Sequence, residues 1–159
     1  MRSRVSSGLL VFRMRAGQLE VFLAHPGGPF FAHRDDGHWT IPKGEIEAGE
    51  EFLATALREF KEEVGIEIDP RSRFFELGSI RQKGGKIVHA WGVEFDWPGK
   101  APVQSSTYKM EWPPDSGRFS EFPEVDRAQY FSIEQARQKI KDTQIPLLDR
   151  LESLLKVAK

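Results

Sequence analysis

The stretch GEIEAGEEFLATALREFKEEVGI, residues 44–66, holds seven glutamates in 23 residues, with a single arginine among them. Four apolar residues in it share one helical stripe about 60° wide, at roughly 100° per residue: Leu53, Leu57, Phe60 and Val64. This pattern predicts a helix over residues 50–64 with its apolar stripe in the core. Gly44 and Gly49 allow a tight turn before the helix, and Gly65 suits a left-handed cap after it.

The acidic side of this helix carries Glu59, Glu62 and Glu63, spaced i, i+3 and i+4. Like charges at this spacing repel one another, and a hard divalent cation offsets the repulsion directly. Magnesium is the expected ion, because it prefers oxygen ligands and commonly bridges carboxylates to phosphates. Arg58 adjoins the cluster, and Glu50 is a good candidate for a bidentate pair with it. The alternative interpretation is a solvated helix face.

The whole stretch fits the pattern Gly-x5-Glu-x7-Arg-Glu-U-x-Glu-Glu-x-Gly-U, in which U is aliphatic or aromatic. Seven fixed positions coincide by chance with a probability on the order of 10⁻⁸ per starting point at average residue usage. The pattern is the Nudix box, so the chain resembles a Nudix hydrolase. The matching positions are Gly44, Glu50, Arg58, Glu59, Phe60, Glu62, Glu63, Gly65 and Ile66.

This resemblance implies one Nudix hydrolase domain over residues 1–159, with the box at residues 44–66. The implied fold class is α/β (α+β), an α/β/α sandwich with a mixed β-sheet and a loop–helix–loop catalytic motif. The implied enzyme is a pyrophosphohydrolase that acts on phosphoric anhydride bonds. Its substrate is a nucleoside diphosphate linked to another group.

Site roles follow from the same resemblance, position by position. Glu59 and Glu63 are expected to bind the metal, and Glu62 to share metal binding with activation of the attacking water. Glu50 is expected to pair with Arg58 and brace the loop. The main-chain carbonyl of Gly44 is a further expected ligand. Mg²⁺ is the expected cofactor, and Mn²⁺ is a possible substitute.

Family members often recruit one more catalytic glutamate from outside the box. Three candidates lie in a long segment rich in proline and glycine: Glu111, Glu121 and Glu124. Glu124 is favoured, because some diadenosine-polyphosphate hydrolases resemble this sequence in having a glutamate six residues before a strand aromatic, here Tyr130. The alternative for each of the three is an exposed loop acid.

Substrate contacts are predicted from residues beside the box and from a basic turn. The segment HWTIPKGEIEAGE, residues 38–50, resembles Nudix enzymes that cleave diadenosine and inositol polyphosphates. Lys43 is expected to hold a phosphate, with Arg81, Lys83 and Lys86 adding to a polyphosphate site. Trp39 is a candidate stacking surface for a base. A solvated hairpin tip and a core tryptophan are the competing interpretations.

The rest of the chain alternates between strand-like and helix-like patterns. Strands are expected over residues 6–14, 19–25, 73–82, 86–95 and 129–131, the first two paired as a hairpin. Residues 96–128 are expected to be irregular and to form a lid or binding loop. Ser132 and Gln135 form a capping-box pattern that opens a helix to about Ile140. A last helix carries Leu147, Leu148, Leu151, Leu154 and Leu155 at helical spacing.

Composition narrows the function class. A net charge of −1 gives no sign of a nucleic-acid track, and the chain has no cysteine for a thiolate site. No stretch is long enough for a membrane span, so a cytoplasmic protein is expected, as a monomer or homodimer. The leading hypothesis is a Mg²⁺-dependent hydrolase of an NTP or a (di)nucleoside polyphosphate. The alternatives are a nucleotide sensor without turnover and a hydrolase of ADP-ribose or a nucleotide sugar.

Overall fold

A mixed β-sheet forms the centre of the protein, whose computed structural model describes residues 5–97 and 104–157. The sheet strands follow the order β4-β5-β1-β2-β8, and β3 pairs with the start of β1. β1 runs parallel to β5 and antiparallel to β2, which makes the sheet mixed. The strands are β1 (Val5–Arg15), β2 (Gln18–Pro26), β3 (Lys43–Glu45), β4 (Phe74–Arg81), β5 (Ile87–Glu94) and β8 (Val125–Ser132).

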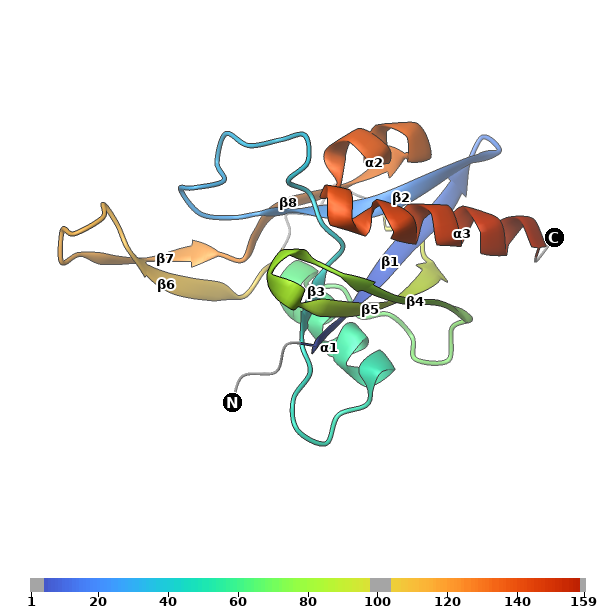
Figure 1. Cartoon of the computed structure of the whole chain (residues 1–159), viewed down its shortest axis with the longest axis horizontal. Coiled ribbons are helices and arrows are strands. Elements are labelled where there is room, and N and C mark those ends of the chain that lie inside the picture. Colours follow the sequence, from blue (N-terminus) through green and yellow to red (C-terminus); the bar gives the residue numbers. More distant parts are fainter. Residues whose placement is uncertain (1–4, 98–103, 158–159) are drawn as a thin grey trace.

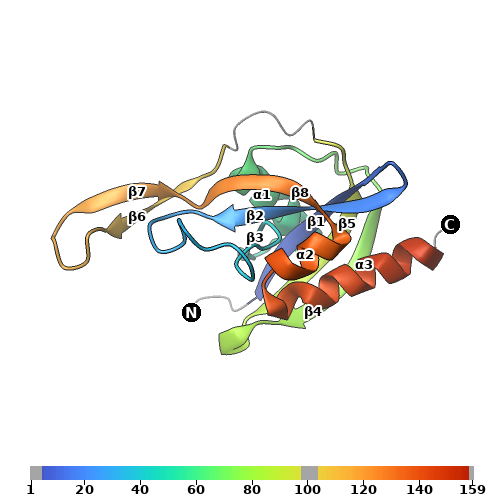
Figure 2. The same ribbon diagram turned by 90° about the horizontal axis from the view of Figure 1, so that it is seen from above.

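Helices cover both faces of this sheet (Figure 1, Figure 2). α1 (Phe52–Val64) lies on one face, and α2 (Ile133–Lys139) and α3 (Ile145–Val157) lie on the other. Side chains of β1 point alternately to the two faces of the sheet. Leu9 packs in the same hydrophobic cluster as Phe60 of α1, and Leu10 packs in the same cluster as Leu148 of α3. The fold is the α/β/α sandwich that the sequence predicts.

The predicted hairpin and helices are confirmed in detail. Phe12 of β1 lies opposite Val21 of β2 in an antiparallel register. The Ser132 hydroxyl accepts a hydrogen bond of 3.2 Å from the Gln135 N–H, as a helix N-cap does. In α3, Leu151 is fully buried, as the apolar spacing predicts. None of the helices within the described ranges is long and apolar enough to cross a membrane.

The prediction of an irregular segment over residues 96–128 is wrong for much of its length. β6 (Thr107–Glu111) and β7 (Phe119–Pro123) form an antiparallel hairpin, and β8 begins at Val125. The hairpin extends from the sandwich at the end opposite α3's C-terminus (Figure 2). Prolines, glycines and serines obscured a short alternation, in which Tyr108 and Met110 are more buried than Lys109. Residues 98–103 of the segment lie outside the described residues.

Candidate active site

The short strand β3 brings Gly44 against the acidic helix α1. A methyl group added to Gly44 would lie 1.9 Å from the carboxyl carbon of Glu59 and 2.1 Å from its Oε2. No side chain fits in that space, so the carboxylate of Glu59 packs directly on the backbone of β3. The first residue of the box thus meets its helix here, as a shared role for Gly44 and Glu59 requires.

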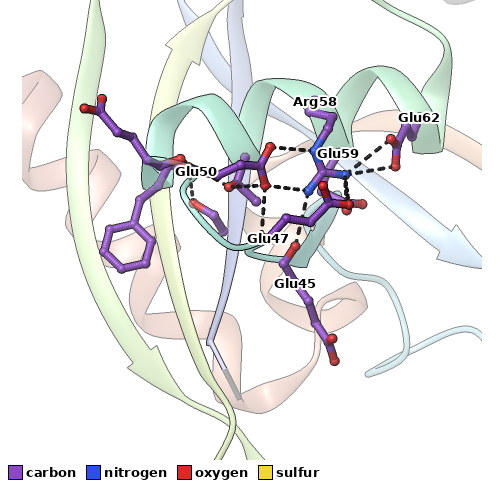
Figure 3. A network of polar contacts seen from close by, with 10 residues as sticks. Glu45, Glu47, Glu50, Arg58, Glu59 and Glu62 are labelled. Carbon is purple, nitrogen blue, oxygen red and sulfur yellow. Dashed lines mark hydrogen bonds and ion pairs between the residues drawn. The ribbon is translucent and has the colours of Figure 1, made fainter. Parts of the chain in front are cut away.

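Arg58 is the centre of the polar network in the box (Figure 3). Its Nε and Nη2 each donate a 2.8 Å hydrogen bond to Glu50, which gives the predicted bidentate pair. Its Nη1 donates to Glu59 at 2.8 Å and reaches both carboxylate oxygens of Glu62 at 3.3 Å. One guanidinium therefore balances part of the negative charge of three glutamates.

Glu50 ties this guanidinium to the loop that precedes α1. Its Oε1 also accepts hydrogen bonds from the Glu47 N–H at 3.0 Å and from the Thr55 hydroxyl at 2.9 Å. These donors favour the charged carboxylate, and the Arg58 hydrogen bonds, as the largest cause, lower the pKa of Glu50 to about 2. The Glu50–Arg58 pair thus fixes the loop relative to the helix.

Because the pKa of Glu50 is low in the folded protein, the free energy of unfolding is expected to depend on pH in the acid range. The pair contributes its full stabilisation above the ordinary glutamate pKa of 4.5 and loses it as the pH falls from there towards 2. We expect Glu50→Gln to be less stable than the wild type at pH 7, with a difference that is constant above about pH 5 and shrinks below it. Urea unfolding of both proteins between pH 7 and pH 3 measures this difference. A difference that grows towards low pH would contradict the assignment.

Glu63 and Glu59 are carboxylates that lack full charge compensation. Glu63 is partly buried beside β3, where its Oε2 accepts a 2.8 Å hydrogen bond from the Lys43 N–H. Burial is the largest of the causes that raise the pKa of Glu63 to about 8; the charges of Glu59 and Glu124 also raise it, against the opposing effects of the Lys43 N–H and ammonium. Burial also raises the pKa of Glu59 against the opposing effect of Arg58. Desolvated acids in this state favour a bound cation, because it stabilises their charged form.

These residues fit a divalent metal ion by their chemistry. Glu59, Glu62 and Glu63 supply hard oxygen donors on one helix, and the backbone of Gly44 lies against the first of them. Within the described ranges, however, no three acidic or histidine side chains already converge in a ligand arrangement. Arg58 holds the Glu59 and Glu62 oxygens instead. Metal binding by Glu59, Glu62, Glu63 and Gly44 stays a prediction.

Among the three candidate loop acids, Glu124 is the one whose charge acts on Glu63 of the box. It joins β7 to β8, and its charge raises the pKa of Glu63. Its backbone is held on both sides, since its N–H donates to the Ser106 carbonyl at 2.8 Å and its carbonyl accepts from Gly27 at 3.0 Å. Glu111 instead accepts a hydrogen bond from the Asp115 N–H within the hairpin tip.

A basic pocket of about 450 Å³ adjoins the box, and Lys43, directly before Gly44, lines it. Its backbone N–H binds Glu63, while its side chain lines the pocket. Burial and the charge of Lys141 lower the pKa of the Lys43 ammonium. Four lysines line the pocket: Lys43, Lys83, Lys86 and Lys141. The structure thus brings the predicted Lys43, Lys83 and Lys86 together.

Two predicted substrate contacts lie elsewhere. Arg81 is exposed at the end of β4 and is not part of the wall of the basic pocket. Trp39 is 2% exposed, and its ring packs edge-on against His25 and Phe131 while its indole N–H donates to Asp35. A buried ring offers no open face to a base, so the competing interpretation, a core tryptophan, describes Trp39.

Sequence reasoning missed Lys141 entirely. It follows α2 and is distant in the sequence from the box and from the KGG turn, so no local pattern links them. The parallel bridge between Trp39 and Ile140, with a 2.9 Å hydrogen bond from the Lys141 N–H to the Trp39 carbonyl, brings it to the pocket. Only the tertiary structure provides this contact.

Comparison with known proteins identifies the class of this site. Residues 2–151 match the family model described as NUDIX domain, so the chain belongs to the Nudix family of pyrophosphohydrolases. The predicted family and enzyme class are thereby confirmed.

Individual relatives share this class. The bis(5'-nucleosyl)-tetraphosphatase [asymmetrical] of Caenorhabditis elegans is 38% identical over 111 residues, which cover 67% of this chain and 76% of that protein. The rat protein of the same name is 63% identical over 61 residues, 36% of this chain and 42% of its own. A crystal structure of a C. elegans Ap4A hydrolase binary complex superposes with a TM-score of 0.69 at 25% identity, over 96% of this chain and 98% of that one.

Proposed function

We propose that the protein is a Mg²⁺-dependent hydrolase of nucleoside polyphosphates, with dinucleoside polyphosphates as the favoured substrates. The observation that carries the proposal is the junction at Lys43 and Gly44. On one side of it lie the desolvated carboxylates of Glu59 and Glu63, and on the other lies the lysine pocket. Carboxylates that favour a cation beside lysines that favour an anion suit a metal-bound phosphate chain.

Each residue of the junction has a role in the proposed reaction. Bound Mg²⁺ or Mn²⁺ would neutralise the pyrophosphate and lower the pKa of the attacking water. Glu59, Glu63 and the Gly44 carbonyl would hold the ion, and Glu62 would share in this and accept the proton of the water. Arg58 and Glu50 fix the helix relative to its loop, as their bidentate pair supports. Lys43 and Lys83 hold phosphate oxygens as point charges.

The names of the relatives support the choice of substrate class. The C. elegans and rat proteins, which are similar to this Nudix-family chain, are called bis(5'-nucleosyl)-tetraphosphatases. A basic pocket beside the box agrees with a substrate that has more phosphates than the pyrophosphate to be cleaved. Cleavage adds water across one P–O–P linkage and yields two phosphorylated products.

A substrate panel tests this function. The wild type is incubated with diadenosine polyphosphates, NTPs, ADP-ribose and nucleotide sugars, each with Mg²⁺, with Mn²⁺ and with a chelator. Products are identified by anion-exchange chromatography. We expect metal-dependent cleavage of the polyphosphates above all others. Preferential cleavage of ADP-ribose or a nucleotide sugar would show that the substrates are not dinucleoside polyphosphates. Binding without any turnover would identify the protein as a nucleotide sensor.

Glu124 is proposed as the additional catalytic glutamate. Its charge acts on Glu63, and its own pKa is raised by partial burial. We expect Glu124→Gln to lower kcat by about 10²-fold, within the range for removal of a group that transfers protons. Glu121→Gln, at an exposed position of β7, serves as the matched control and should leave kcat unchanged. Equal rates for the two variants would exclude Glu124 from the reaction.

A further inference from the structure

Lysines from separate segments of the chain converge in the basic pocket, where the charges of Glu63 and Glu59 act on Lys43 without forming a salt bridge to it. Lys43 comes from β3, Lys83 from the turn η1 (Lys83–Gly85), and Lys141 from the link after α2. Within the described residues, no salt bridge involves any of the four pocket lysines, and Asp142 is the one acid in the wall. The pocket therefore holds an excess of positive charge.

This concentration of charge costs stability in the free protein. The Lys141 side chain is partly buried, and its pKa is lowered by burial and then by the charge of Lys86. Like charges that face a shared pocket repel one another, and the effect is strongest where water is excluded. A bound polyanion would remove this repulsion and satisfy the ammonium groups.

A buried glutamine fixes the geometry of the pocket. Gln144 is fully buried in η2 (Asp142–Gln144), and its Oε1 accepts a 3.0 Å hydrogen bond from the Ile41 N–H. Its Nε2 donates to the Gln82 side chain at 2.9 Å, and its backbone N–H donates to the Lys141 carbonyl at 2.9 Å. Gln144 thus joins the segments that carry Lys43, Lys83 and Lys141. The backbone segments that carry the lysines are thus fixed relative to one another before any ligand binds.

We propose that Lys141 completes a subsite for the phosphates beyond the pyrophosphate that is cleaved, and that this subsite favours substrates with a longer phosphate chain. The inference rests on the proposed function and deepens it. The box takes the reacting pyrophosphate, and Lys43 connects it to the pocket. Lys141 is a specificity-determining residue, and Gln144 is a positioning residue behind it.

Binding of inorganic tripolyphosphate in the presence of EDTA tests the subsite apart from catalysis. Calorimetry is performed on the wild type and on Lys141→Met, which keeps the stem and removes the charge. We expect the wild type to bind and Lys141→Met to bind about 10-fold more weakly, as for loss of one charge-assisted contact. Lys141→Arg should retain the affinity. Lys109→Met, at an exposed lysine of β6 outside the pocket, should match the wild type.

Stability and kinetic measurements on the same variants distinguish phosphate binding by Lys141 from a purely structural role of this residue. Lys141→Met should be at least as stable to urea as the wild type, since it removes a repelled charge. Its KM for diadenosine tetraphosphate should rise about 10-fold, with a smaller change for ADP-ribose and with most of the effect in KM. Equal tripolyphosphate affinity in the wild type and Lys141→Met would overturn the subsite, even if metal-dependent cleavage is found. Lysine-dependent binding without cleavage of any nucleotide would instead overturn the proposed function and leave the subsite standing.

Discussion

Gly44→Ala is expected to lower kcat by about 100-fold or more while the protein still folds. The added methyl group would lie 1.9 Å from the carboxyl carbon of Glu59, which must then move away from β3. A displacement of about 1 Å in a catalytic group is enough for a loss of this size. The affinity for Mg²⁺ should fall as well, because the same carboxylate is proposed as a ligand. Steady-state kinetics across a Mg²⁺ titration measure both effects.

A matched glycine substitution separates this steric effect from a general effect on the backbone. At Gly17 an added methyl group would meet no atom within 4 Å, although φ there is +77° and alanine is strained. Gly17→Ala should therefore lose some stability and keep the wild-type kcat. If Gly44→Ala keeps its kcat and its Mg²⁺ dependence, the Glu59 carboxylate is not required where it lies in the structure.

Glu62→Gln is expected to reduce kcat by about 10²- to 10⁴-fold with little change in nucleotide binding. Such losses are typical when a general base is removed, and the amide cannot accept the proton of the water. The side chain of Glu62 is 48% exposed and reaches Arg58 only at 3.3 Å, so the fold does not depend on its charge. Rapid-quench kinetics give the turnover, and calorimetry with a nucleotide gives the binding.

The control for Glu62 is another exposed glutamate close in the sequence. Glu67 lies beyond the end of α1, paired with Lys61 at 3.5 Å. Glu67→Gln removes the same charge from the same region and should keep the wild-type turnover. If Glu62→Gln also kept it, Glu62 would not be the group that activates the water.

Local sequence patterns predicted the parts of the protein that local physics determines. The apolar stripe of α1, the Ser132 cap and the leucines of α3 each follow from helical spacing or from one hydrogen bond within a turn. The Glu50–Arg58 pair was predictable as well, because both residues belong to one loop–helix unit. The box in this way identified the family, and the family implied the sandwich.

Features that depend on distant contacts could not be read from the sequence. Lys141 reaches the basic pocket through the pairing of Ile140 with Trp39, and Trp39 is buried because β8 and α2 cover it. The β6–β7 hairpin was predicted as loop, since its two strands are only five residues each and lie among prolines and glycines. In each case, tertiary packing outweighed the local composition.

Cleavage of diadenosine tetraphosphate in ¹⁸O-labelled water tests the central claim most directly. The wild type is incubated with Mg²⁺ or with EDTA, and the products are analysed by mass spectrometry. We predict two nucleotide products with Mg²⁺, one of which carries a single ¹⁸O atom at a phosphate, and intact substrate with EDTA. Substrate that stays intact with Mg²⁺, or equal cleavage in EDTA, would contradict a metal-dependent hydrolysis at the box.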